Sequence, residues 1–130
     1  MYSFNVNTAQ RVELIDITSQ VQSAVSAGGL DDGLCMVFVP HTTAGVTINE
    51  NADPDVRKDI IKELNALVPF NDGYSHSEGN SAAHIKASLV GFSLTLCVER
   101  GRVQLGTWQG IYFAEFDGPR KRTVWVKILK

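Results

Sequence analysis

The chain has 130 residues, a length that suits one compact domain with its own core. Apolar residues make up 44% and charged residues 20% of the chain, a balance that excludes extensive disorder. The formal net charge of -2 excludes a basic field spread over the whole sequence, so we expect no nucleic-acid partner.

The first third of the chain predicts two strands and a helix. Residues 11–17 alternate between polar and apolar, as in a half-buried strand. Thr18 resembles an N-cap, apolar residues then recur at helical spacing, and Gly28 ends the helix. Residues 34–39 form a continuous apolar run, which predicts a strand buried on both faces and ended by Pro40.

The middle of the chain predicts two more helices around a polar loop. Asp53 followed by Pro54 is a strong helix start, and Pro69 closes that helix. Residues 70–79 read as a loop rich in Asn, Asp, Gly and Ser. A third helix starts at Asn80 or Ser81 and ends at Gly91.

The last part predicts three strands, at residues 92–99, 109–116 and 123–128. Their connections are too short for parallel crossovers, so we expect an antiparallel meander. The fold class is therefore α+β, with antiparallel β-sheets packed as a sandwich, about three helices and a single domain over residues 1–130.

Two further features concern the cell compartment. No apolar stretch approaches the roughly 18 residues of a membrane span, and residues 1–5 lack a signal-peptide pattern. We therefore expect a cytoplasmic protein without a membrane partner. Cys35 and Cys97 each lie in a predicted strand and in no CxxC pair, which predicts two buried, reduced thiols.

All three histidines, His41, His76 and His84, lie in polar segments rather than in apolar runs. We expect the three imidazoles to converge. Converging imidazoles would hold Zn²⁺ with a carboxylate or water as a fourth ligand, or would transfer protons. Alternatively, His76 and His84 meet near the start of the third helix, where free N–H groups suit a phosphate, or they are ordinary surface residues.

Three other segments are candidates for binding, each with a structural alternative. The first segment lies between the strand at residues 34–39 and the second helix, and it contains Thr42, Thr43, Asn49 and Glu50. A turn with Asx caps would explain only part of the many polar residues there. The segment Leu105-Gly106-Thr107-Trp108-Gln109 is a ligand loop or a packed turn. Arg120, in the basic run 120–122, is a phosphate clamp or a solvated strand start, and Glu115 and Asp117 face the same side.

Five motifs occur together in one order along the chain. They are Pro40-His41-Thr42-Thr43-Ala44, the run Asn49 to Val56, the set His76, Gly79, Asn80 and His84, the run Leu105 to Gln109, and Glu115-x-Asp117-Gly118-Pro119-Arg120. In these motifs the chain closely resembles the secondary thiamine-phosphate synthase enzyme family, also called the YjbQ-like family. The resemblance extends from about Arg11 to Ile128.

This resemblance implies a small-molecule enzyme that is usually a homotrimer. The implied reaction joins a hydroxymethylpyrimidine diphosphate to a thiazole phosphate and releases pyrophosphate, as a main or a side activity. The implied catalytic residues are His41, Glu50 and His84, with His41, His76 and His84 as metal candidates. The implied substrate-binding residues are Thr42, Thr43, Asn49, Asn80, Thr107, Trp108, Gln109 and Arg120.

Two other functions compete with this transferase. One is a metal-dependent hydrolase or lyase, in which the histidines hold a metal-bound water and Glu50 is the general base. The other is a non-catalytic trimer that binds a metal or a metabolite. The expected cation is itself open, because a diphosphate favours Mg²⁺ whereas three histidines favour Zn²⁺.

Overall fold

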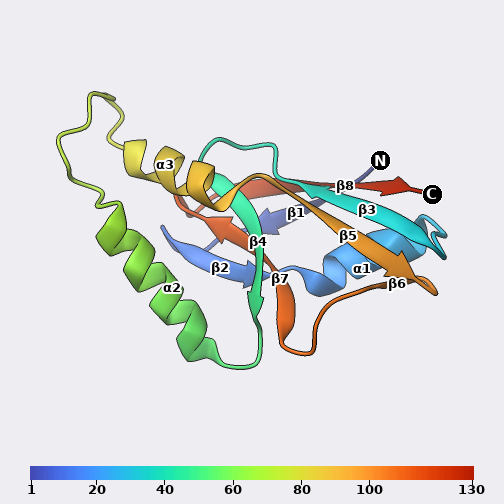
Figure 1. Cartoon of the computed structure of the whole chain (residues 1–130). Helices are drawn as coiled ribbons and strands as arrows, with labels where there is room; N and C mark the ends of the chain where they lie inside the picture. Colours follow the sequence, from blue (N-terminus) through green and yellow to red (C-terminus); the bar gives the residue numbers. More distant parts are fainter.

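Strands dominate the protein, and the computed structural model describes all residues, 1–130 (Figure 1). In chain order the elements are β1 (Tyr2–Asn7), β2 (Glu13–Asp16), α1 (Thr18–Ala27), β3 (Gly33–Phe38), β4 (Ala44–Glu50), α2 (Pro54–Leu67), α3 (Ser81–Val90), β5 (Ser93–Glu99), β6 (Arg102–Val103), β7 (Gln109–Glu115) and β8 (Lys121–Leu129). None of the helices has the length and apolar character needed to cross a membrane.

The strands form two sheets in which every pairing is antiparallel. One sheet has the order β1-β8-β3-β5-β6 and the other has the order β2-β7-β4. The larger core lies between the two sheets and includes one face of α1. The second, smaller core lies between the other face of β7 and the helices α2 and α3. The expected α+β sandwich with three helices is confirmed.

Local sequence explains the helix boundaries. The Asp53 carboxylate accepts a hydrogen bond from the Asp55 N–H at 2.9 Å, and Pro54 is the first helical residue, as the sequence predicts. Helix α3 begins at Ser81 and ends before Gly91, whose φ of 99° is open mainly to glycine.

A buried lysine joins the two helices that cover the smaller sheet. Lys86 of α3 is fully buried, and its Nζ donates to Asn65 Oδ1 of α2 at 2.5 Å. The ammonium also lies 3.8 Å from the ring centre of Phe70, directly after α2. Burial, and then the charge of Arg11, lower the pKa of Lys86 to about 8.

The region around β3 corrects two expectations. The strand is buried on one face only, because Leu34, Met36 and Phe38 point to an outer face of the five-stranded sheet that nothing covers. On the neighbouring strand β5, Cys97 points to the same outer face and is exposed, whereas Cys35 is buried. The thiols are therefore unpaired, but only one of them is buried.

The predicted meander in the last third is also wrong. Strands β5 and β6 form a hairpin, but β7 then crosses to the other sheet, where it pairs with β2 and β4. Strand β8 returns to the first sheet between β1 and β3. The strands β1 and β4, which the sequence analysis does not predict, supply the missing partners.

Candidate functional site

A cavity of about 680 Å³ opens where the β3–β4 connection, the start of α3 and the β7–β8 loop meet. Nine of its lining residues are polar or charged, and the other four are apolar residues that form one wall. The lining residues are Phe38, Val39, Pro40, His41, Thr42, Thr43, Glu78, Asn80, His84, Phe92, Asp117, Arg120 and Arg122. The sequence candidates His41, Thr42, Thr43, Asn80, His84 and Arg120 thus come together here.

A buried ion pair forms the floor of this cavity. Arg122 is 2% exposed and binds the fully buried Glu115 carboxylate through both Nε, at 2.7 Å, and Nη2. Thr43 accepts a further hydrogen bond from Nη2 at 2.8 Å, and Thr8 donates to Glu115 at 2.9 Å. The Nε and Nη2 atoms of Arg122 are therefore paired, whereas Nη1 makes no hydrogen bond to another group of the chain.

His41 is fixed as a hydrogen-bond donor to the cavity. Its Nε2 accepts the Thr123 backbone N–H at 2.9 Å, so in the neutral ring Nδ1 carries the proton. Burial, and then the positive charge of Arg122, lower the pKa of His41. A ring in this state offers Nδ1–H to an anionic ligand, and neither of its nitrogens has a lone pair free for a metal.

This assignment predicts the pH response of His41. Nitrogen NMR should show the Nδ1–H tautomer and a pKa below the ordinary 6.5. The unfolded chain takes up a proton at its ordinary pKa while the folded protein does not, so stability from this group falls as pH drops below about 6.5. An Nε2–H tautomer at neutral pH would contradict the assignment.

The opposite wall of the cavity is held by Asp117. Its carboxylate accepts from Asn80 Nδ2 at 2.9 Å and from Arg120 Nη2 at 3.0 Å. The Asn80 Oδ1 atom is buried and has no partner, so it is available to an N–H or O–H group of a ligand. Arg120 is half exposed at the rim, whereas Arg122 is buried and held by more hydrogen bonds, so Arg122 is the more rigidly placed of the two guanidiniums.

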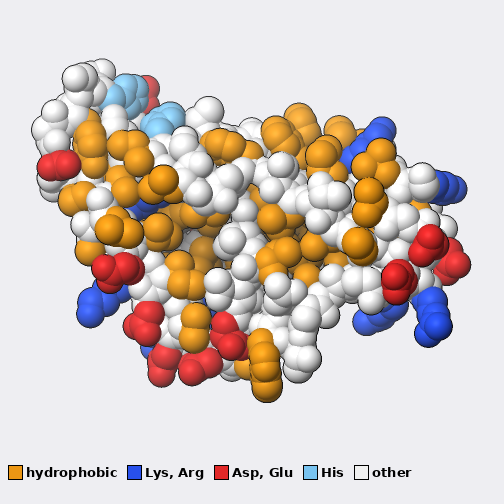
Figure 2. All heavy atoms as spheres, in the orientation of Figure 1, with side chains coloured by type: hydrophobic (Ala, Val, Ile, Leu, Met, Phe, Trp, Pro, Cys, Tyr) orange, Lys and Arg blue, Asp and Glu red, His pale blue; other side chains and the backbone are white.

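The histidines come together only in part. His76 and His84 lie edge to face with their ring centres 5.8 Å apart, and His84 lines the cavity together with His41. Figure 2 shows histidine side chains gathered at the end of the molecule where α3 begins. No group of three His, Cys, Asp or Glu side chains is arranged to hold a metal ion. The expected three-histidine metal site is therefore not formed within one chain, because His41 is turned to Thr123.

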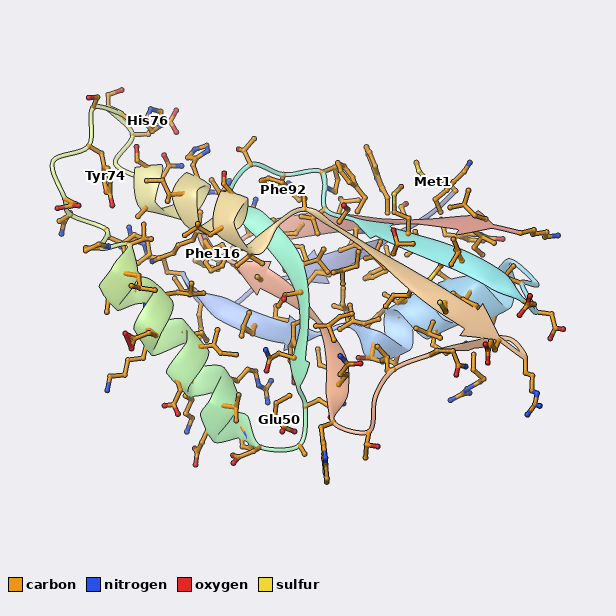
Figure 3. The ribbon with its side chains drawn as sticks, viewed as in Figure 1. Met1, Glu50, Tyr74, His76, Phe92 and Phe116 are labelled. Carbon is orange, nitrogen blue, oxygen red and sulfur yellow. The ribbon has the colours of Figure 1, made fainter.

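The remaining sequence candidates lie at the other end of the molecule. Glu50 pairs with Gln109 at the far end of the β4–β7 ladder, while Ala44 pairs with Glu115 beside the cavity. Figure 3 shows Glu50 far from His76 and Phe92. Asn49, Thr107 and Trp108 adjoin Glu50 and Gln109 in the sequence, and none of the five lines the cavity. Glu50 therefore cannot act as a general base at the histidines of its own chain.

Comparison with known proteins gives a consistent answer for the whole chain. Residues 2–130 match the family described as UPF0047 protein YjbQ-like. The chain belongs to the YjbQ-like family. A UPF0047 protein of Methanocaldococcus jannaschii is 54% identical over 99% of this chain and 94% of its own length. The UPF0047 protein YugU of Bacillus subtilis is 49% identical over 98% and 97% of the two chains.

Solved structures of the YjbQ-like family share the fold. A protein of Clostridium acetobutylicum, described as an uncharacterised conserved protein of this family, has a TM-score of 0.97 and 54% identity, covering 99% of this chain and 100% of that one. A conserved hypothetical protein of Thermus thermophilus has a TM-score of 0.93 and 44% identity, covering 99% and 100%.

Arg122 is a candidate that the sequence alone does not single out. It lies in the same basic run as Arg120, and two arginines of one run look alike when the strand is not known. In β8 the burial alternates, so Arg122 points inward with Val124 and Val126. The signal that could have identified it is this period of two, counted back from the apolar residues.

Proposed function

We propose that the cavity binds the phosphoryl group of a small phosphorylated heterocycle and that the protein is an enzyme of the secondary thiamine-phosphate synthase type. The observation that carries the proposal is the buried Arg122 guanidinium, which lines the cavity, is oriented by Glu115 and keeps Nη1 unpaired. A charged N–H donor that is fixed in place binds phosphate oxygens strongly, and Nη1 is the donor that Glu115 and Thr43 leave unpaired.

The roles of the lining residues follow from their hydrogen bonds. Arg122 and the Nδ1–H of His41 would bind the departing pyrophosphate as its negative charge grows. Asn80 Oδ1 would accept a hydrogen bond from an amino group of the heterocycle. His84 makes no side-chain hydrogen bond and lines the same cavity, so it is free to contact the diphosphate or to exchange a proton with it.

A divalent cation has a limited place in this proposal. Within one chain the donor set does not fit Zn²⁺, because no three suitable side chains meet and His41 has no free lone pair. Mg²⁺ fits better, because it binds through diphosphate oxygens with one or two carboxylates, and Glu78 and Asp117 line the cavity.

A homotrimer is the assembly that accompanies this proposal. The outer face of the five-stranded sheet carries exposed apolar side chains, such as Leu34 and Leu129, that association would bury. The subunit number itself comes from the family resemblance described above.

The proposal is tested by His84→Ala, with His76→Ala as the matched control. His84→Ala should weaken binding of inorganic pyrophosphate at least tenfold by calorimetry, because it removes one of the few direct ligand contacts. Its free energy of unfolding should change by about 1 kcal/mol or less, because the side chain is partly exposed and makes no hydrogen bond. His76→Ala should bind normally, because His76 does not line the cavity.

Other outcomes separate the competing functions. Equal loss of binding in both histidine variants would indicate a metal held by the histidine pair and would favour the hydrolase or lyase. Normal pyrophosphate binding without turnover of the pyrimidine diphosphate and thiazole phosphate would favour a non-catalytic metabolite-binding protein. Binding unaffected by His84→Ala would overturn the proposed site.

A further inference from the structure

Residues that the family resemblance assigns to one site lie at two ends of one chain. The ladder of β4 and β7 runs from the pair Ala44 and Glu115, beside the cavity, to the pair Glu50 and Gln109. At about 3.4 Å per residue these ends are roughly 20 Å apart. Trp108, which directly precedes Gln109, therefore cannot reach the cavity of its own chain.

The loop that carries Trp108 is nevertheless held in one conformation. Gln109 Oε1 accepts the Gly106 N–H at 2.7 Å, and the Asn51 N–H binds the Trp108 carbonyl at 2.9 Å. Gly110 packs directly on Asn51, where a Cβ atom would lie only 2.8 Å from the Asn51 Cβ. These contacts rigidify the backbone, while Trp108 as a residue stays 63% exposed.

A rigid loop with a single exposed indole is typical of a binding surface. Tryptophan is a large amphipathic side chain, and it is enriched among the residues that dominate the energy of protein interfaces. Holding it out in advance lowers the entropy lost when a partner covers it. Within its own chain, Trp108 does not belong to the smaller core and does not line the cavity.

The cavity offers a surface that suits this loop. One wall is apolar, formed by Phe38, Val39, Pro40 and Phe92. Phe38 also stacks on Trp125, with ring centres 5.6 Å apart, so the apolar wall continues onto the uncovered face of the five-stranded sheet.

The two ends also differ in charge. The Trp108 end adjoins Glu50 and the exposed Asp53, whereas the cavity contains the guanidiniums of Arg120 and Arg122 beside Glu78 and Asp117. In Figure 2 acidic side chains gather around α2 and the β4–α2 connection, with basic side chains among them, and a further acidic group lies beside the histidines. Contact of one end with the other end of a second copy would therefore bring Glu50 and Asp53 toward the two guanidiniums of the cavity.

We propose that the Trp108 loop of one copy of this chain closes the cavity of a second copy, so that the indole covers the ring of the ligand bound there. The stacking of the indole on a ligand rests on the proposed function. The contact between two copies is independent of the proposed function. Because two different surfaces meet, the interface is head to tail, and in a homotrimer its threefold repetition would close a ring. Trp108 and Gln109 would then serve the same site as Arg122 and His41 of the neighbouring copy.

The first test uses fluorescence without any phosphate ligand. The chain has two tryptophans, so Trp125→Phe leaves Trp108 as the only one and keeps an aromatic ring on Phe38. Light scattering should give the mass of an oligomer. At the same protein concentration, the fluorescence emission of Trp108 should be shifted to the blue, and iodide should quench it only weakly. A monomer, or an oligomer in which iodide quenches Trp108 as freely as it quenches the free amino acid, would overturn the proposal.

The second test locates the shielded loop. In a Cys97→Ser background, Thr107→Cys and Thr42→Cys place one thiol beside Trp108 and one at the cavity rim, too far apart to be joined within a chain by a short bis-maleimide. Chains that carry both thiols should give covalent dimers and larger rings, whereas either single cysteine should give none. Absence of such products in the double variant would show that the loop docks elsewhere. Neither test uses pyrophosphate, so each can succeed or fail independently of whether the cavity binds pyrophosphate. The two proposals can therefore be rejected separately.

Discussion

Arg122→Met should destabilise the protein by about 3–5 kcal/mol, because it leaves the Glu115 carboxylate buried and without its cation. Thr8 and the Asp117 N–H would remain as hydrogen-bond donors, but neither carries a positive charge. Thr43 would in addition lose the donor to its hydroxyl. Urea unfolding at neutral pH measures the loss.

Two further variants separate this effect from the simple loss of an arginine. Arg120→Met removes a half-exposed guanidinium from the Asp117 ion pair and should cost no more than about 1 kcal/mol. Combining Arg122→Met with Glu115→Leu removes both buried charges and should recover much of the stability. If Arg122→Met costs no more than Arg120→Met, the floor of the cavity is not held by this ion pair.

Gly45→Ala should also be strongly destabilising, at the upper end of the roughly 1–3 kcal/mol typical of overpacked sites. A Cβ atom on Gly45 would lie 2.5 Å from the carbonyl oxygen of Gly91, which joins α3 to β5. That oxygen accepts the Val46 N–H at 3.1 Å, so β4 and the end of α3 cannot separate without losing a hydrogen bond.

Gly106→Ala is the control for this substitution. The nearest atoms to its Cβ belong to the Gln109 side chain, with Oε1 at 3.2 Å, so rotation of that side chain relieves the contact and costs at most its hydrogen bond to the Gly106 N–H. Thermal unfolding should therefore show a large decrease in Tm for Gly45→Ala and a small one for Gly106→Ala. Similar decreases would mean that α3 can move away from the sheet more easily than its contacts indicate.

Local signals in the sequence predicted most of the elements. The Asp53-Pro54 pair and Gly91 marked the ends of α2 and α3, and alternation over residues 93–98 identified β5. Strand β4 was not predicted, because His41, Thr42 and Asn49 make that segment look like a polar loop. Its buried residues Ala44 and Val46 have short side chains, so the alternation of apolar and polar residues along this strand is weak in the sequence.

The candidate site was only partly predictable for a different reason. The polar residues near His41, Asn80 and Arg120 share one cavity because β3, α3 and the β7–β8 loop lie side by side there. Such tertiary contacts cannot be read from the order of residues along the chain. The separation of Trp108 from this group depends on the register of β4 with β7. A motif shows which residues belong together in function, but not whether one chain or two supply them.

The position of β8 has a consequence for how fast the protein folds. Strand β8 pairs Val126 with Tyr2 of β1 and also with Val37 of β3, so the five-stranded sheet is complete only when distant parts of the chain have met. Closing so long a loop costs entropy before any hydrogen bond compensates for it. Domains with such non-local pairing fold in roughly milliseconds to seconds rather than microseconds. During that interval the β3–β5–β6 segment would expose the β3 edge, which is where a folding chain would be most prone to pair with another.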